Sequence, residues 1–271
     1  MSSRVVTRAE YHVRVARAVR AVLQRDVRLA ALIPARFAAQ RLPGKPLADI
    51  GGAPMVVRVA QRAASAEGVD EVAVATDDPR IAAAVNQAGF RALMTDPGCR
   101  NGTERIAQAA RDLPADGYLN VQGDEPLVDP EAIAAVGRLV RSGAEMATAA
   151  RPLEPGEEGL PQVVKVVLDA RERALYFSRS LIPYPRSAGE TQALAHVGIY
   201  GFSAAALQRF ARLPETGLER AEGLEQLRAL WHGIPIQVAV GSFRSVAVDT
   251  PEDLERVRKL FSEESSPRRS K

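Results

Sequence analysis

Apolar residues follow two different spacings along the chain. Short continuous apolar runs, such as LAALIPA at 29–35 and EVAVAT at 71–76, are typical of strands that are buried on both faces. A longer segment, 53–68, has apolar residues three and four positions apart, with Pro54 near its start and Gly68 at its end, as in a helix. The pattern therefore predicts strands and helices that follow one another in turn.

This alternation continues without a break over the first half of the chain. Strands that alternate with helices favour a mostly parallel sheet with helices on both faces, an α/β fold. The predicted elements, in order, are strand 29–35, helix 53–68, strand 71–76, helix 78–89, strand 90–94, helix 103–113, strand 117–122 and helix 130–143.

The pattern changes after about residue 145, where strand-like runs come in succession at 145–150, 163–169 and 174–180. Successive strands with short connections favour antiparallel pairing, and we expect an antiparallel insertion or arm here. A strand at 196–202, two helices, a strand at 236–241 and a helix at 251–261 then complete the predicted fold.

The ends of the chain differ from this central domain, which we place at 29–262. Residues 1–28 form an Arg-rich extension that is compatible with a partner-binding surface helix, an accessory extension or a basic, amphipathic transit peptide. Residues 263–271 are polar, and we expect a flexible tail.

Composition excludes several classes of protein. No apolar run is long enough to span a membrane, and no secretory signal is present. The net charge is only +3, and its cations are spread along the chain, which argues against nucleic-acid binding. A single cysteine, Cys99, fits a reducing compartment, and we expect a cytoplasmic protein.

The loop after the first strand carries three cations, Arg36, Arg41 and Lys45. Their side chains could converge on a polyphosphate, or they could belong to a solvated basic loop. The pair Gly44-Lys45 is not a P-loop, because Pro46 stands where that motif needs Ser or Thr.

Acidic residues follow two other strands. Asp124, in VQGDEP, and Asp249, in VAVDTPEDL, are suited to bind Mg²⁺ on a nucleotide, which takes one or two carboxylates plus phosphates. Each also has a structural alternative, because Asp124 could form a turn and Asp249 could begin the last predicted helix. Ligands of open α/β sheets lie at the carboxyl ends of the strands, where both acids are expected.

Further polar residues are expected at the same edge. Thr76 and Asp77 follow the second strand, and Gly102, Thr103 and Arg105, in NGTER, begin a helix that could face a base or phosphate or could simply be capped.

His196 and Tyr200 lie four residues apart on one strand, so they share a face, either as a polar pocket or as core residues. Glu225 and Gln226 look like ordinary helix surface. The sequence offers no Ser-His-Asp order, no zinc cluster and no GxGxxG after the first strand.

From about Leu29 to Leu260 the sequence resembles the 3-deoxy-manno-octulosonate cytidylyltransferase (CMP-KDO synthetase) family. The segments that carry the resemblance occur in the family's order: IPARFAAQRLPGKPL, VATDD, NGTERIA, LNVQGDEPLV, VKVVLD, ALYFSRSLIP, HVGIYGF, LEQLRALW and VDTPEDLERV.

The resemblance implies a three-layer nucleotide-diphospho-sugar transferase fold of Rossmann-like type, with a mixed, mostly parallel sheet and an antiparallel dimerisation arm, and hence a homodimer. It implies transfer of CMP from CTP to 3-deoxy-D-manno-octulosonate (KDO), for lipopolysaccharide biosynthesis, with Mg²⁺ as cofactor. By resemblance, the phosphates are bound by Arg36, Arg41 and Lys45, and the nucleotide is surrounded by Ala35, Thr76, Asp77, Gly102, Thr103 and Arg105. Mg²⁺ is bound by Asp124 and Asp249, and the sugar by Gln122, His196, Tyr200, Glu225 and Gln226. The resemblance gives as the catalytic set Arg36, Lys45, Asp124 and Asp249.

The sequence departs from the family pattern in three places. The segment between Pro183 and His196 is shorter than usual, Ala195 stands where an Arg often precedes the His, and Asn101 replaces a Ser. Two alternatives therefore stay open: a nucleotidyltransferase of the same fold for another acid sugar, such as an amino derivative of KDO, and a non-catalytic nucleotide-binding relative.

Overall fold

The computed structural model describes residues 27–38, 42–186 and 193–265. The predicted phosphate ligand Arg41, almost all of the 1–28 extension and the end of the 263–271 tail lie outside these residues, so those three interpretations stay predictions.

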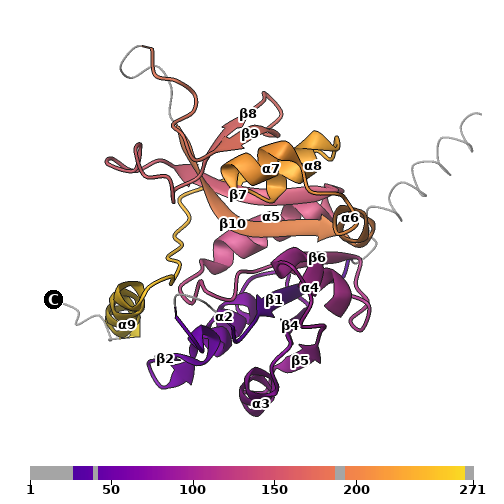
Figure 1. Cartoon of the computed structure of the whole chain (residues 1–271), viewed down its shortest axis with the longest axis vertical. Helices are drawn as coiled ribbons and strands as arrows, with labels where there is room; N and C mark the ends of the chain where they lie inside the picture. The colour runs from indigo at the N-terminus through magenta and orange to yellow at the C-terminus, as the bar shows by residue number, and fades with distance from the viewer. Residues whose placement is uncertain (1–26, 39–41, 187–192, 266–271) are drawn as a thin grey trace, which may run out of the picture.

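A mixed sheet forms the centre of the molecule (Figure 1), with strand order β11-β7-β10-β6-β1-β4-β5. Only β10 runs against its neighbours on this path, so the expectation of a mostly parallel sheet is confirmed. The strands are β1 Leu29–Ala35, β4 Glu71–Thr76, β5 Arg91–Met94, β6 Gly117–Asn120, β7 Met146–Pro152, β8 Lys165–Leu168, β9 Ala174–Ser178, β10 Leu194–Ser203 and β11 Ile236–Val240.

Helices cover both faces of the sheet, which gives three layers (Figure 1). One face carries α2, α3 and α5, and the other carries α4, α6 and α8, with α7 packed on α8. The helices are α2 Met55–Ala64, α3 Pro79–Gln87, α4 Gly102–Ala109, α5 Pro130–Arg141, α6 Ala204–Phe210, α7 Gly217–Glu222, α8 Gln226–Trp231 and α9 Pro251–Ser265.

Strand β1 shows why a continuous apolar run was the right signal for the centre of the sheet. Leu29, Ala31 and Ile33 pack under α2 and α5, while Ala30 and Leu32 pack on the opposite face under α4. Both faces of the strand are therefore shielded from solvent, and every position along it is apolar.

The antiparallel arm is smaller than the sequence pattern suggested. Strands β8 and β9 pair with each other, and β8 joins β10, as an arm should. The run at 145–150, however, is β7, which lies in the main sheet between β10 and β11. Its small apolar residues fit that position, because both faces and both edges of β7 are covered.

A small hydrophobic cluster brings residues from near the start of the described chain together with the last helix, α9. A short hairpin, β2 (Asp49–Ile50) and β3 (Ala53–Pro54), packs with α9 around Ile50, Met55 and Val257, and the preceding 3-10 turn η1 (Lys45–Leu47) packs on α2. Figure 1 shows α9 beside β2, at the end of a long segment that comes from β11. We call residues 241–250 of this segment the crossing segment; they contain no helix or strand.

Most predicted elements appear at the expected places, with boundary shifts of a few residues. Two helices were expected between the strands at 196–202 and 236–241, and the structure has three short ones, α6, α7 and α8. No helix among the described residues is both long enough and apolar enough to cross a lipid bilayer.

Candidate functional site

A cavity of about 570 Å³ opens at the carboxyl ends of β1 and β6, where an α/β sheet normally binds its ligand. It is lined by the end of β1, by η1, by the start of α4, by the turn after β6 and by the end of the crossing segment. The predicted site residues among its lining are Ala35, Arg36, Lys45, Gly102, Arg105, Gln122, Asp124 and Asp249.

The turn after β6 fits against the end of β1 because residue 123 is a glycine. A Cβ on Gly123 would lie 2.5 Å from the carbonyl oxygen of Pro34, which is too close for any side chain. Close packing of these two backbones places Gln122 and Asp124 beside Ala35 at the wall of the cavity.

Lys45 lies between the two predicted metal ligands. Its Nζ is 2.8 Å from Oδ2 of Asp124 and 3.3 Å from Oδ1 of Asp249. The lysine side chain is only 12% exposed, whereas those of Asp124 and Asp249 are 37% and 53% exposed. Two carboxylates from distant parts of the chain thus converge on one positive charge. We call Asp124 and Asp249 the acid pair.

The acid pair also fits a divalent cation. Carboxylate oxygens are the ligands that Mg²⁺ prefers, and it usually binds one or two of them with substrate phosphates and water. Among the described residues, no group of three or more His, Cys, Asp or Glu could hold a metal ion. An ion at the acid pair would therefore complete its coordination with oxygens from water or from a substrate.

Two exposed arginines border the same cavity. Arg36 is exposed at the end of β1, as predicted for a phosphate ligand. Arg100 was missed by the sequence interpretation, although it lies directly before the NGTER motif. Its side chain is 66% exposed and forms an ion pair with Glu104 in the first turn of α4. A basic residue next to a candidate nucleotide motif was the signal that could have identified it.

Three of the predicted nucleotide contacts form a supporting group. Arg105 is buried and forms a 2.8 Å ion pair with Asp77, and its other terminal nitrogen donates to Thr95 Oγ1 at 2.5 Å. The hydroxyl of Thr76 is fully buried and accepts from the backbone N–H of Asp78. Arg105 borders the cavity while its charge is engaged by Asp77. Direct nucleotide contact by these residues stays a prediction.

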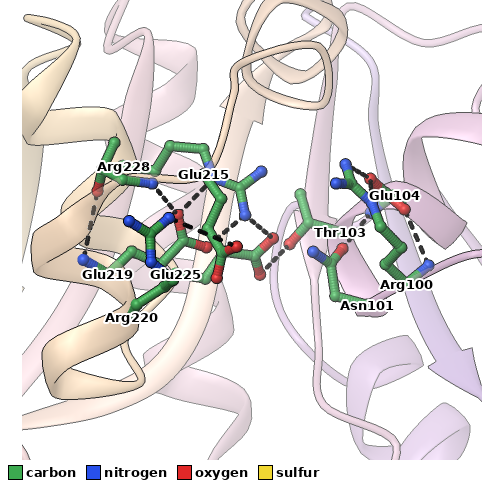
Figure 2. A network of polar contacts seen from close by, with 10 residues as sticks. Arg100, Asn101, Thr103, Glu104, Glu215, Glu219, Arg220, Glu225 and Arg228 are labelled. Carbon is green, nitrogen blue, oxygen red and sulfur yellow. Dashed lines mark hydrogen bonds and ion pairs between the residues drawn. The ribbon is translucent and has the colours of Figure 1, made fainter.

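Beside the cavity lies an interior polar cluster, which consists of Thr103, Asn120, His196, Tyr200, Glu225 and Gln226. Thr103 donates a 2.9 Å hydrogen bond to Glu225 Oε2 (Figure 2), which connects α4 with the start of α8. Tyr200 on β10 pairs with Asn120 on β6, and the Asn120 amide reaches Thr103 at 3.5 Å.

Several atoms of this cluster have no hydrogen-bond partner in the protein, although Glu225 Oε1 lies 3.7 Å from a terminal nitrogen of Arg228. Asn120 Oδ1, Glu225 Oε1 and Gln226 Nε2 are shielded from solvent and have no hydrogen bond among the described residues. Buried polar atoms without partners are rare in proteins because each one costs free energy. Their presence makes this cluster a candidate binding site for a polar ligand, and their burial distinguishes Glu225 and Gln226 from ordinary helix surface.

His196 and Tyr200 share one face of β10, as their spacing predicted, and their ring centroids are 5.4 Å apart. His196 Nε2 is 2.9 Å from Thr148 Oγ1. Burial lowers the pKa of His196 to about 3, so the imidazole is neutral near pH 7. Burial also raises the pKa of Tyr200 well above its usual value. Both side chains are therefore uncharged hydrogen-bonding groups.

Gln122 connects the cavity with the interior polar cluster. It borders the cavity, and its Cγ lies 3.9 Å from the position that a Cβ of Gly198 would take, on β10 between His196 and Tyr200. The two groups of predicted residues, assigned to nucleotide and sugar, are thus neighbours in the fold.

Glu125 is a further residue that the sequence interpretation missed. It is buried, and it accepts a hydrogen bond from the hydroxyl of Ser245 on the crossing segment. Burial raises the pKa of Glu125 to about 7. Its position after Asp124 in VQGDEP resembled a turn, and no sequence feature indicated that its side chain points inward.

Comparison with known proteins gives a consistent result. The model of the cytidylyltransferase family matches residues 30–238. A 3-deoxy-manno-octulosonate cytidylyltransferase from Anaeromyxobacter sp. (strain Fw109-5) is 56% identical over 238 residues, 87% of this chain and 97% of that protein. One from Neisseria meningitidis serogroup A is 49% identical over 245 residues, 85% of this chain and 96% of that protein.

Solved structures agree with these relatives. A structure described as CMP:2-keto-3-deoxy-manno-octonic acid synthetase complexed with CTP superposes with a TM-score of 0.84 at 43% identity, and covers 88% of this chain and 99% of that chain. A cytidylyltransferase from Leptospira borgpetersenii, at 16% identity and a TM-score of 0.60, shares the fold. The family match includes Asp124 and ends before Asp249.

Proposed function

The chain belongs to the cytidylyltransferase family, and from this premise we propose that it transfers CMP from CTP to the anomeric hydroxyl of KDO, for lipopolysaccharide biosynthesis. The products are CMP-KDO and pyrophosphate. The structural observation that carries the proposal is the convergence of the acid pair on one positive charge, at the wall of a cavity that adjoins buried polar atoms without hydrogen-bond partners.

The cavity is the proposed CTP site. Arg36 and Lys45 bind the phosphates together with Arg41, while Ala35, Gly102 and Thr103 adjoin the nucleoside. Lys45 already contacts both acids, so it can exchange carboxylate oxygens for phosphate oxygens when CTP binds. Thr76, Asp77 and Arg105 hold the start of α4 and the end of β4 in place through their buried contacts.

The interior polar cluster is the proposed KDO site. A sugar acid offers many hydroxyl groups, and these can pair with Glu225 Oε1, Gln226 Nε2 and Asn120 Oδ1, which form no hydrogen bond among the described residues. His196, Tyr200 and Gln122 border the same region. Because Gln122 also borders the cavity, a sugar bound here would present its hydroxyl toward the CTP phosphates.

Cytidylyltransferases generally use a divalent metal ion, and we propose Mg²⁺ at the acid pair. Asp124 and Asp249 would hold the ion. When bound, Mg²⁺ would neutralise phosphate charge and lower the effective pKa of the sugar hydroxyl.

The nucleophile belongs to the substrate, which agrees with the absence of a Ser-His-Asp order in the sequence. The hydroxyl oxygen of KDO forms a bond to the α-phosphorus of CTP, the bond from that phosphorus to the bridging oxygen of the β-phosphate breaks, and the hydroxyl proton passes to water. The protein aligns two anions and stabilises the charge on the departing pyrophosphate through Arg36 and Lys45.

We further propose a homodimer in the cytoplasm, where CTP is available. The β8–β9 arm extends from the main sheet, and α8 packs against β9 (Figure 1). Leu175 on β9 and Trp231 at the end of α8 are 60% and 62% exposed, which suits a surface that a second copy would cover. Light scattering of the purified chain tests this state.

The experiment that tests the proposed reaction is pyrophosphate release with CTP or UTP and with KDO or an amino derivative of KDO, each with and without Mg²⁺. We expect turnover with CTP and KDO that requires Mg²⁺. Faster turnover with the amino sugar would shift the assignment to the other acid sugar. No turnover with any pair would identify a non-catalytic nucleotide-binding relative.

A further inference from the structure

We propose that Glu125 and Ser245 form a positioning pair that fixes the distance between Asp124 and Asp249. The proposal rests on the proposed function, because it assigns a task to residues beside the acid pair. Neither residue contacts the cavity directly, since neither belongs to its described lining. Both are positioning residues that act through the acids.

The need for such a pair follows from where Asp249 lies. Asp124 is in the turn that follows β6, which is held by hydrogen bonds to both neighbouring strands. Asp249 lies on the crossing segment, which has no helix or strand of its own. Sheet hydrogen bonds therefore cannot set the position of Asp249 relative to Asp124, and side-chain and single backbone contacts have to do so.

Two hydrogen bonds connect the crossing segment with residues 124 and 125, and a third, 3.4 Å long, joins the backbone N–H of Arg244 to Oδ2 of Asp129 farther along the same loop. The backbone N–H of Val248 donates to the carbonyl oxygen of Asp124 at 2.9 Å. The hydroxyl of Ser245 donates to Oε2 of Glu125. The first contact joins Val248, the residue before Asp249, to Asp124 itself. The second contact involves Glu125, the residue that follows Asp124. Together with the apolar packing of Val246 and Val248 in the cluster that contains Leu127, they hold the end of the crossing segment against the turn.

The surroundings of Glu125 support a structural role for its carboxyl group. Glu125 is 8% exposed, and burying a carboxyl costs more free energy than burying an apolar group of the same size. Its Oε1 lies 3.2 Å from the position that a Cβ on Gly198 would occupy, so glycine leaves room for it on β10. Glu125 therefore lies between the crossing segment and the strand that carries His196 and Tyr200.

The result of this arrangement is visible at Lys45. Its Nζ is within 3.3 Å of both carboxylates, a geometry that fails if the crossing segment moves by a small amount. A cation at the acid pair would depend on the same spacing, because carboxylate ligands must meet a Mg²⁺ ion at about 2.0–2.1 Å.

The test is Mn²⁺ binding to the full chain in the presence of CTP, measured by calorimetry and by electron paramagnetic resonance. For Ser245→Ala we expect Mn²⁺ affinity to fall by about fivefold or more, the equivalent of one hydrogen bond of about 1 kcal/mol. Ser245→Thr keeps the hydroxyl and should restore most of the affinity. CTP affinity measured in EDTA should stay within about twofold of the wild-type value.

Two further comparisons separate positioning from a general loss of stability. Ser142→Ala removes a serine hydroxyl that bonds to Arg138 in α5, away from the site, and should leave Mn²⁺ affinity unchanged. Combining Glu125→Ala with Ser245→Ala should weaken Mn²⁺ binding no more than Glu125→Ala alone, because the two residues act through one contact.

Unchanged Mn²⁺ affinity in Ser245→Ala, or fully additive effects in the double variant, would overturn the proposal. Wild-type protein that binds no Mn²⁺ with CTP present would overturn both this pair and the metal assignment. Failure of the proposed reaction has a different signature: Mn²⁺ binding that responds to Ser245→Ala, with no turnover of any ulosonic acid, supports the positioning pair and refutes the reaction.

Discussion

The hydroxyl of Thr103 donates a 2.9 Å hydrogen bond to the carboxylate of Glu225, and this contact joins the first turn of α4 to the start of α8 (Figure 2). Thr103 lies next to Gly102 at the proposed CTP site, and Glu225 belongs to the proposed KDO site. The other carboxylate oxygen of Glu225 is 3.7 Å from Arg228, which is itself held by Glu219. Glu225 is therefore oriented from both sides, with α4 as one of its supports.

Replacing Thr103 tests this relationship. Thr103→Val keeps the shape and removes the donor, so the Glu225 carboxylate loses its direct hydrogen bond within the protein. We expect the KM for KDO to rise about tenfold, with a smaller change in the KM for CTP. Steady-state kinetics measure both values. Thr103→Ser should recover most of the loss, and an equal rise in both KM values would contradict a role through Glu225.

Glu225→Gln should stabilise the protein while it weakens sugar binding. Burial raises the pKa of Glu225 in the folded state, so the folded chain binds more protons than the unfolded chain between the unfolded and folded pKa values. Stability from this group is thus present at low pH and lost as pH rises through that window. We expect Glu225→Gln to have a higher Tm than wild type at about pH 8 and little difference at about pH 4. An equal difference at both pH values would refute the assignment.

The contribution of His196 to stability should depend on pH in the opposite direction. Its folded pKa of about 3 lies below the usual 6.5, so the unfolded chain binds a proton that the folded chain does not as the pH falls below about 6.5. Stability from the neutral imidazole is present above that value and is lost toward pH 3. Between about pH 7.5 and 5, the loss is about 2 kcal/mol. Urea unfolding should show that the free energy of unfolding of His196→Gln falls by a correspondingly smaller amount over this pH range than that of the wild type. Identical losses in the two proteins would contradict this assignment.

Asp249→Asn should disable the acid pair. An amide is a weaker cation ligand than a carboxylate, and of the two side chains that contact Lys45 Nζ here only Asp124 would keep its charge. We expect kcat with saturating CTP and KDO to fall about 100-fold or more. The matched control is Asp112→Asn, an exposed acid outside the cavity lining, which should retain wild-type kcat. Unchanged Mg²⁺-dependent turnover in Asp249→Asn would refute the metal role.

Gly123→Ala should destabilise the fold and the site together. The added Cβ would meet the Pro34 carbonyl oxygen at 2.5 Å, and backbone on both sides of the contact leaves little room to adjust. We expect the free energy of unfolding to fall by about 2–3 kcal/mol. Gly159→Ala is the control, because no atom lies within 4 Å of its added Cβ. Similar effects of both substitutions would show that the close approach is unimportant.

The sequence predicted structure correctly where a single physical cause, such as burial on both faces of a strand, determines the residue types. The run at 29–35 is apolar throughout because β1 is covered on both faces, and that pattern predicted the centre of the sheet. Asp124 and Lys45 could be assigned to one edge because carboxyl ends of parallel strands meet there.

Other parts depended on contacts that local patterns do not carry. The run at 145–150 has strand character, but only its neighbours β10 and β11 show that it belongs to the main sheet rather than to the arm. Glu225 resembled helix surface because its partner Thr103 is distant in sequence. Glu125 was missed for the same reason, since Ser245 lies on a segment with no regular pattern at all.

The crossing segment has a consequence for how the protein folds. All strands from β7 to β11 lie between Asp124 and Asp249 in sequence, so the acid pair can form only after the chain closes a very long loop and α9 docks on β2. Contacts with such large sequence separation form late, because the entropy of loop closure opposes them. The sheet can therefore assemble first, while the cavity wall that contains Asp249, and with it the ability to hold a cation, forms in the final folding step.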